Sequence, residues 1–413
     1  MIYPSTRGKT TIDDFELLQV LGKGAHGKVI LVEKKNQKGT FYAMKILKKK
    51  HIIESNSLEH TKAEKKVLSH GQHPFLVSLK YAFQTDQKIY FVMEFMKGGE
   101  LFQHLKRNGK FSEQQAAFIG ACLVLALGHL HNKDMIYRDL KPENVLLDDR
   151  GFAKLTDFGL VKFLKQDENA KTFCGSPEYL PPEVITSADC NRPADWWGLG
   201  CLLYELLNGI PPFYHSNVQK MYHNIAKKTL KFQNENLSQD CKDLIAGLLE
   251  KDPKKRIGSQ ADSLEVMNHP FFKDINWTAL LSKKLEPPYN PFQNHNKWEK
   301  FFDENFLKMN PVDSICPADS SLLRQFHKEF EIFDTHETNN SHLSVDIPPQ
   351  EDKFATKMTA NLSEQDTKVD FVTETPNNQV KADKRNNLFD EDNCFKSSRE
   401  CDRLNNIADD FVP

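Results

Sequence analysis

The sequence predicts an α+β fold of two lobes, a small one rich in strands followed by a larger helical one. Residues from about 15 to 95 contain short β-branched and aromatic runs that glycines and polar turns separate, which is typical of strands. From about residue 100 to 272, apolar residues instead recur with helical spacing. In such an arrangement we expect a ligand to bind in the cleft between the sheet and the helices.

The individual elements follow from the same patterns. Strands are expected at 15–21, 28–32, 41–47 and 88–95, and helices at about 58–68, 116–130 and 195–207. The last segment is polar, with too little apolar surface to offset chain entropy, so we expect disorder there. The resulting division is an extension at 1–14, a domain at 15–272 with lobes at 15–95 and 96–272, a wrapping tail at 273–335 and a disordered acidic tail at 336–413.

Composition excludes several classes of protein. The formal net charge of −2 provides no global field for nucleic acid or an anionic membrane. The eight cysteines lack CxxC or Cys/His spacing, which argues against a disulfide framework and a zinc site and favours a reducing compartment. The start has no signal-peptide core, position 2 is not glycine, and no apolar run reaches membrane-spanning length. We expect a monomer in the cytosol, with the nucleus as the alternative.

Two short segments carry the chemistry. The segment YRDLKPEN at 137–144 supplies a carboxylate (Asp139), a cation (Lys141) and an amide (Asn144), and DFG follows at 157–159. We expect Asp139 to orient a substrate hydroxyl and Lys141 to neutralise charge that develops during transfer. Asn144 and Asp157 offer the oxygen ligands that Mg²⁺ prefers. This order and spacing indicate transfer of a phosphoryl group.

A glycine-rich turn lies between two of the predicted strands. The pattern GKGAHGKV at 22–29 could be a dinucleotide site or a plain hairpin, but a strand after it favours a hairpin that covers nucleotide phosphates. On the next strand, Lys45 is placed to reach those phosphates if a carboxylate holds it. Glu64, in the predicted helix at 58–68, is the candidate partner, and a solvated helix face is the alternative for this residue.

These segments, with several others, resemble the AGC-type serine/threonine protein kinases. The resemblance extends from Phe15 to about Phe333 and favours protein kinase B, the serum- and glucocorticoid-regulated kinases and their ribosomal-protein kinase relatives. The segments that carry it are FVMEF at 91–95, GGEL at 98–101, YRD at 137–139, TDFGL at 156–160, TFCGSPEYL at 172–180 and DWW at 195–197.

The resemblance implies the bilobal eukaryotic protein kinase fold, with ATP and Mg²⁺ as cofactors. It also implies that Leu68, Leu79, Tyr137 and Phe158 stack as a regulatory spine above Asp195, and that Glu183 pairs with Arg256. The residues implied to contact ATP are Leu21, Gly22, Lys23, Gly24, Ala25, His26, Gly27, Val29, Ala43, Lys45, Met93, Glu94, Met96, Glu100 and Leu146.

Substrate preference is a further implication. In Arg-directed relatives, carboxylates at the positions of Glu100, Glu143 and Glu205 receive arginines that precede the acceptor. Bidentate contacts favour Arg over Lys, so the expected substrates are proteins with Arg upstream of Ser or Thr. The alternative is that these three residues are ordinary surface acids.

Regulation is expected at Thr172, the activation-loop position. A phosphate there would be bound by Arg138, with His60 and Lys162 as further candidates, after action by an activator resembling phosphoinositide-dependent kinase. Ser176 and Pro182 depart from the usual Thr and Ala of this segment, and the serine keeps the hydroxyl.

The wrapping tail departs from the pattern of these relatives. Asn310 and Pro311 stand where they carry a phosphorylated Thr-Pro or Ser-Pro. Phe330 and Phe333 match a hydrophobic motif, and Asp334 follows where relatives add a phosphate. We expect the two rings to dock beside the Glu64 helix without a second activating kinase, a chance aromatic pair being the alternative. Phe302 is expected near the adenine region.

Two other classes of protein remain as alternatives. A pseudokinase that acts as a scaffold usually lacks the lysine or one of the catalytic carboxylates, whereas Lys45, Asp139, Asn144 and Asp157 are all present here. A metabolic phosphotransferase of related fold does not need the segment at 172–183, which is typical of a platform for protein substrates.

Overall fold

The computed structural model describes residues 10–24, 27–70, 72–164, 174–187, 190–293, 295–313, 326–333 and 336–337. The chain divides into two units, residues 1–338 and 339–413, and every described residue belongs to the first. Nearly all of the predicted disordered tail, together with Ala25, His26, Thr172 and Asp334, therefore lies outside the described residues.

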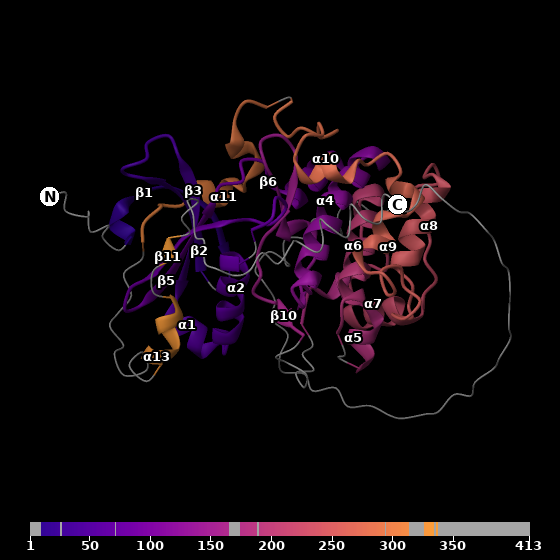
Figure 1. Cartoon of the computed structure of the whole chain (residues 1–413), viewed down its shortest axis with the longest axis horizontal. Helices are drawn as coiled ribbons and strands as arrows, with labels where there is room; N and C mark the ends of the chain where they lie inside the picture. The colour runs from indigo at the N-terminus through magenta and orange to yellow at the C-terminus, as the bar shows by residue number, and fades with distance from the viewer. Residues whose placement is uncertain are drawn as a thin grey trace, which may run out of the picture. The chain divides into compact units, whose positions relative to one another are not determined.

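The first lobe is a six-stranded sheet with two helices (Figure 1). The sheet has the strand order β1-β2-β3-β5-β4-β11, and every pairing is antiparallel. Phe15, Tyr42, Phe83 and Tyr90 belong to the core on one of its faces. The strands are β1 (Phe15–Gly24), β2 (Gly27–Lys34), β3 (Phe41–Lys48), β4 (Leu79–Gln84), β5 (Lys88–Glu94) and β11 (His336–Glu337), and the helices are α1 (Lys49–Glu54) and α2 (Leu58–His70).

Between residues 41 and 95, the prediction missed α1 and β4. Helix α1 is only six residues long, too short for a periodic apolar pattern, and no side chain caps its first turn. In strand β4, Leu79, Ala82 and Phe83 are buried and the other residues are half-buried, which is not the strict alternation that marks a half-buried strand. Its place in the sheet is set by pairing with β5.

The second lobe is helical, and its core is α4 (Glu113–Asn132) packed against α6 (Pro193–Asn208). Ser112 and Gln115 form a capping box at the start of α4, and Gly209 ends α6 in a left-handed conformation. The other helices are α3 (Leu101–Asn108), α5 (Pro182–Ser187), α7 (Val218–Lys227), α8 (Gln239–Leu248), α9 (Ser263–Met267) and α10 (Trp277–Leu281).

Helix α4 corrects one expectation from the sequence, that no segment is long and apolar enough to cross a membrane. Its 20 residues meet both criteria of length and composition, and among the described residues no second helix does. However, 83% of the apolar window is buried inside the fold. The apolar residues of α4 therefore form the centre of the helical lobe.

Short strands between the lobes hold the loops that carry the chemistry. Strands β6 (Gly99–Glu100), β8 (Val145–Leu147) and β9 (Ala153–Leu155) form one small sheet, and β7 (Met135–Ile136) pairs with β10 (Lys162–Phe163). The turn η2 (Pro142–Asn144) leads into β8, and η3 (Pro177–Tyr179) precedes α5. The two small sheets thus fix both ends of the segments that contain Asp139 and Asp157.

The tail wraps onto the strand lobe as predicted. In Figure 1 the orange elements α11 (Glu304–Leu307), α13 (His327–Phe330) and β11 lie among the indigo elements of the first lobe. Gln19 of β1 donates to the carbonyl of Leu307 at 2.9 Å. Beyond the predicted boundary at residue 335, His336 and Glu337 pair with Tyr81 and Ala82, because the edge of β4 offers unpaired backbone groups.

A buried histidine joins three parts of the helical lobe. His131, at the end of α4, is fully buried, and its two ring nitrogens lie 2.8 Å from Asp195 of α6 and 2.8 Å from Asp262. Both ring nitrogens face carboxylate oxygens. The ring can donate both hydrogen bonds only when it is protonated, as the imidazolium. Burial opposes that charge, but the hydrogen bonds with the two carboxylates outweigh it and raise the pKa of His131 to about 9.

This shift predicts a loss of stability at alkaline pH. The pKa of His131 is raised by folding, so its stabilisation is complete below about pH 6.5 and is lost as the pH rises through about 9. The loss should be on the order of 3 kcal/mol. Urea unfolding between pH 6 and pH 10 should show this slope, and His131→Gln should lack it. If the free energy of unfolding changed with pH in the same way for the two proteins, the assignment of a charged His131 would be contradicted.

Candidate active site

The catalytic loop is held by one buried carboxylate, that of Asp195 in α6. Its two oxygens accept the backbone amides of Tyr137 and Arg138, each at 2.8 Å, and Asp195 is 2% exposed. Arg138 has a φ of +69°, a conformation that costs energy for a residue with a side chain. The hydrogen bonds to Asp195 stabilise this backbone conformation. They thereby fix the orientation of the next residue, Asp139.

Asp139 lies at the centre of a polar cluster. Its carboxylate accepts from the amide of Asn144 at 2.7 Å and from the hydroxyl of Ser176 at 3.3 Å, and it lies 3.2 Å from the ammonium of Lys141. Lys141 also donates to the Ser176 hydroxyl at 2.7 Å. Burial raises the pKa of Asp139 above its ordinary value, although Lys141 opposes the shift. A raised pKa makes the carboxylate a better proton acceptor.

The predicted pair between Lys45 and Glu64 is present, and Asp157 joins it. The ammonium of Lys45 lies 2.6 Å from Glu64 and 3.4 Å from Asp157. Burial opposes the charge on Lys45, yet the two carboxylates outweigh burial and raise its pKa. Burial also raises the pKa of Glu64, whereas Lys45 lowers the pKa of Asp157. Asp157 thus stays ionised, with its side chain 53% exposed.

Phe158 points the opposite way from Asp157, into the core. Phe158 is 1% exposed and contacts Tyr137 edge to face at 5.9 Å. Leu68 and Leu79, the other predicted members of the spine, are buried as well. Asp157 has a φ of +55°, so the backbone turns sharply between a solvent-facing carboxylate and a buried ring. This turn directs Asp157 toward Lys45.

Several of the residues predicted to line the nucleotide site lie on strands of the large sheet and of the small sheet between the lobes. Met93 is paired with Ala43 in the sheet, and Leu146 is paired with Glu100 in the small sheet below. Val29, Ala43 and Leu146 are half-buried. At Gly24 a side chain would meet nothing within 4 Å, whereas at Gly27 it would meet the carbonyl of Ile46 at 1.9 Å. Of the remaining predicted positions, Leu21, Met93 and Met96 are buried, Lys23 is exposed, and Glu94 is turned toward Lys154, which donates to it at 2.7 Å.

The three glutamates predicted to bind substrate arginines differ in exposure. Glu100 and Glu143 are half-buried. Glu100 lies on β6, which pairs with β8, and Glu143 lies in η2, which leads into β8. Glu205 is only 2% exposed and accepts from the hydroxyl of Tyr179. The alternative, that these residues are ordinary surface acids, is therefore wrong for Glu205, because α6 is buried on nearly all sides. Binding of a substrate arginine by Glu205 stays a prediction.

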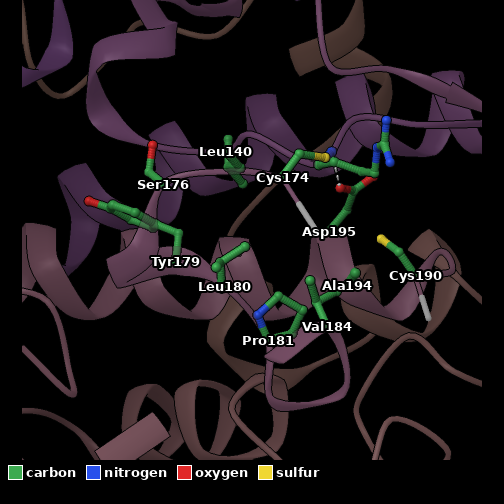
Figure 2. A pocket seen from close by; sticks show the side chains of 12 residues that line it. Leu140, Cys174, Ser176, Tyr179, Leu180, Pro181, Val184, Cys190, Ala194 and Asp195 are labelled. Carbon is green, nitrogen blue, oxygen red and sulfur yellow. Dashed lines mark hydrogen bonds between the residues drawn. The ribbon is translucent and has the colours of Figure 1, made fainter. Parts of the chain in front are cut away.

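The segment after residue 173 is held on the helical lobe. Glu183 of α5 and Arg256 form the predicted pair through two hydrogen bonds of 2.7 and 2.8 Å, and Arg256 is fully buried. Figure 2 shows a cavity between this segment and the catalytic loop, lined among others by Arg138, Tyr179 and Asp195.

Of the predicted ligands of a phosphate on Thr172, His60 has its pKa lowered by burial and by Arg138, so its ring is largely neutral at neutral pH.

The two phenylalanines of the tail are docked. Phe330 is 2% exposed and Phe333 is fully buried, and the Phe333 ring lies 6.1 Å from that of Phe91 in β5. Lys65 of α2, the helix that carries Glu64, donates to the carbonyl of Ile332 and lies over the Phe333 ring. Gln84 of β4 donates to the carbonyl of Phe330 at 3.0 Å. The tail therefore packs against the helix that positions the partner of Lys45.

Sequence reasoning missed several residues that support the site. Trp298 joins Phe302 and Phe95 in an aromatic cluster where the lobes meet, and its only signal was that it is an aromatic residue in an irregular segment. His104 is fully buried between the carbonyl of Gly98 and the hydroxyl of Tyr289. Tyr289 is 185 residues from His104, and Phe95 is likewise far from Trp298 along the chain, so no local pattern could reveal these two contacts.

Comparison with known proteins assigns the chain to a family. The protein kinase domain family matches residues 15–272. The chain is 46% identical to human serine/threonine-protein kinase Sgk2 over 320 residues, which are 77% of this chain and 87% of Sgk2. It is 48% identical to human RAC-beta serine/threonine-protein kinase over 315 residues, 76% of this chain and 65% of that protein.

A third relative is the serine/threonine-protein kinase YPK1 of Saccharomyces cerevisiae. It is 44% identical over 328 residues, which are 79% of this chain and 48% of YPK1. The chain thus spans about half the length of YPK1 and most of the length of Sgk2.

The chain belongs to the protein kinase family. Within that family it is a serine/threonine protein kinase of the AGC type, similar to the Sgk, RAC and YPK1 enzymes. The bilobal fold and the spacing of Lys45, Glu64, Asp139 and Asp157 agree with this membership.

The donor set fits a hard divalent cation. The amide nitrogen of Asn144 donates to the carboxylate and to the carbonyl of Asp139, so its amide oxygen is the atom that can face a cation. Asp157 adds an ionised, exposed carboxylate. Such oxygen donors are the ligands that Mg²⁺ takes together with nucleotide phosphates. Among the described residues, no cluster of three His, Cys, Asp or Glu side chains offers an alternative metal site.

The cluster around Asp139 predicts the effect of a single substitution. Asp139→Asn keeps the shape of the side chain but removes the proton acceptor, so kcat should fall by roughly 100-fold to 10,000-fold. The melting temperature should change little. The control is Asp149→Asn, an acid whose side chain is 55% exposed on the turn after β8. Comparable kcat for the two variants would contradict the assigned role.

Proposed function

We propose that this protein transfers the γ-phosphoryl group of Mg·ATP to Ser or Thr residues that have Arg upstream in protein substrates. The single observation that supports this most directly is the cluster of Asp139, Lys141 and Asn144 opposite the Lys45, Glu64 and Asp157 network. One carboxylate has a raised pKa and the other a lowered pKa. This difference suits one residue to a proton and the other to a metal ion.

Each group has a distinct part in the proposed reaction. Asp139 orients the acceptor hydroxyl, and Lys141 stabilises charge on the transferring group. Lys45, held by Glu64, binds the nucleotide phosphates. Asn144 and Asp157 would hold Mg²⁺, which supplies neutralisation of phosphate charge when it is bound. The hydroxyl of Ser176 bridges Asp139 and Lys141. In the proposed reaction, the hydroxyl of the substrate would take the place of the Ser176 hydroxyl.

The preference for upstream Arg rests on Glu100 and Glu143. Glu100 lies on β6 and Glu143 lies in η2, and these two elements contact each other beside β8. Two half-buried carboxylates on such elements would suit a guanidinium, which can make bidentate contacts that an ammonium cannot. Glu205 belongs to the same proposed arginine site, and its carboxylate accepts a hydrogen bond from the hydroxyl of Tyr179.

Activation is proposed to need one phosphorylation, at Thr172, by an activator resembling phosphoinositide-dependent kinase. The docked positions of Phe330 and Phe333 support a tail that is bound without modification. Asp334 follows Phe333 in the sequence and would supply a permanent negative charge. The protein is further proposed to act as a monomer in the cytosol, with the nucleus as the alternative.

An oriented peptide library tests the proposed reaction. With Mg·ATP and protein phosphorylated at Thr172, we expect labelling of Ser and Thr peptides that carry upstream Arg. Asp157→Ala should abolish labelling, and Glu143→Gln should reduce the selection of Arg over Lys by about tenfold. Labelling that ignores upstream Arg would remove the specificity, and no labelling at all would favour a scaffold.

Docking of the tail predicts a difference between neighbouring residues. Phe330→Ala combined with Phe333→Ala should lower activity about tenfold or more, because α2 loses the packing that seats Glu64. The matched control is Ile332→Ala, in the same turn but 49% exposed, which should retain activity. The measurement is kcat/KM on one Arg-containing peptide. Equal values for the two variants would rule out a role for docking.

A further inference from the structure

A carboxylate of the wrapping tail is held in the outer face of the strand lobe. Asp313 accepts a hydrogen bond from the hydroxyl of Tyr90 at 2.9 Å, and its other oxygen pairs with the ammonium of Lys88. Lys88 and Tyr90 are separated by one residue in β5, so both side chains lie on the same face of the sheet. Their contacts with Asp313 span more than 220 residues of sequence.

Burial makes this contact stronger than ordinary ion pairs of the surface. The Lys88 side chain is 6% exposed and that of Asp313 is 25% exposed. The same tail segment contains a contrasting pair, Glu304 with Lys308, whose side chains are 82% and 74% exposed. An exposed pair of that kind contributes little to stability, whereas removing the partner of a buried charge is strongly destabilising.

The tail segment 302–313, which contains Asp313, lies against the first two strands. Gln19 of β1 donates to the carbonyl of Leu307 at 2.9 Å, and Lys28 of β2 donates to the carbonyl of Val312 at 3.4 Å. At its other end, Phe302 stacks on Phe95, where the lobes meet, at 5.9 Å. Strands β1 and β2 carry the glycine-rich turn between them. The segment 302–313 therefore connects the junction of the lobes to the strands on both sides of that turn.

We propose that Asp313 is a positioning residue for nucleotide binding, which it serves by anchoring segment 302–313 over β1 and β2. The anchor limits the movement of both strands, so the glycine-rich turn is held near the position in which it contacts phosphate. The carboxylate is part of the encoded chain, so this anchor needs no modifying enzyme. The inference rests on the proposed nucleotide site, and its effect appears in nucleotide affinity rather than in the phosphoryl-transfer step.

The test compares two single substitutions in the tail of the full chain. Asp313→Asn keeps the size of the side chain and an oxygen that can accept from Tyr90, but removes the negative charge that faces the buried Lys88. Glu304→Gln is the control, because it removes an equally charged group from an exposed pair of the same segment. Asp313→Asn should raise Kd and KM for Mg·ATP by about fivefold to tenfold and leave kcat within about twofold. Glu304→Gln should change none of these values.

Hydrogen exchange supplies a readout that does not depend on activity. Amides of 303–313, β1 and β2 should exchange about tenfold faster in Asp313→Asn, equivalent to about 1.4 kcal/mol, while those of α4 stay unchanged. The reversal Asp313→Lys with Lys88→Asp should restore both exchange and nucleotide affinity. Such a result would show that the pairing of charges, not the identity of either residue, is what matters.

Three outcomes would overturn the proposal. One is that Asp313→Asn matches Glu304→Gln in exchange and in Kd. Another is that exchange accelerates while Kd stays constant, which would leave Asp313 a merely structural role. The third is that Asp313→Asn lowers the melting temperature and kcat together, and the charge reversal does not restore them. Wild-type protein that binds Mg·ATP but phosphorylates no peptide would instead contradict the proposed function and leave the anchor intact.

Discussion

The carboxylate of Asp195 is the constraint on which the rest of the site depends. It lies within α6, one of the two most buried helices, and accepts the backbone amides of Tyr137 and Arg138. It also faces His131, which joins α4 and Asp262 to the same cluster. A strained loop conformation persists only when surrounding contacts determine it fully, and here one buried side chain provides them. The position of Asp139 is therefore set by the core of the helical lobe rather than by the loop itself.

The two lobes contribute opposite electrostatic environments to one site. Asp139 is buried on the helical side, where desolvation raises its pKa, and Asp157 faces the strand lobe, where Lys45 lowers its pKa. Glu64 keeps Lys45 in place, and its helix α2 is packed in turn against the docked Phe333 through Lys65. A contact more than 250 residues away in sequence thus supports the ion pair in the cleft. Helix α2 thus links the tail to the catalytic residues through packed side chains.

The tail contacts the strand lobe at several successive places and with different chemistry at each. Aromatic stacking at Phe95 and Phe302 fixes it at the junction of the lobes, and a buried charge pair fixes it at Asp313. Two buried rings then fix it at α2 and β4, and backbone pairing with β4 completes the path. Because these contacts are spread over the whole lobe, the tail completes the fold of the strand lobe.

Local patterns in the sequence were sufficient for the fold class, for most long elements and for the choice of the candidate catalytic residues that the structure brings together. Glycine spacing, a carboxylate-rich loop and the pattern of a buried helix are encoded within a few residues, so Asp139, Asp157 and α4 could be predicted without a structure. The pair of Lys45 with Glu64 was predicted from the strand and helix patterns, and the pair of Glu183 with Arg256 from family resemblance; the structure contains both.

Only the tertiary structure decided the remaining features. The burial of Glu205, the double ion pair of His131 and the contacts of Asp313 with Lys88 and Tyr90 were not visible in the sequence. Each depends on side chains from elements far apart along the chain. Periodicity and spacing report what a residue does within its own helix, strand or turn, whereas burial and the choice of a charged partner are set only when the elements pack.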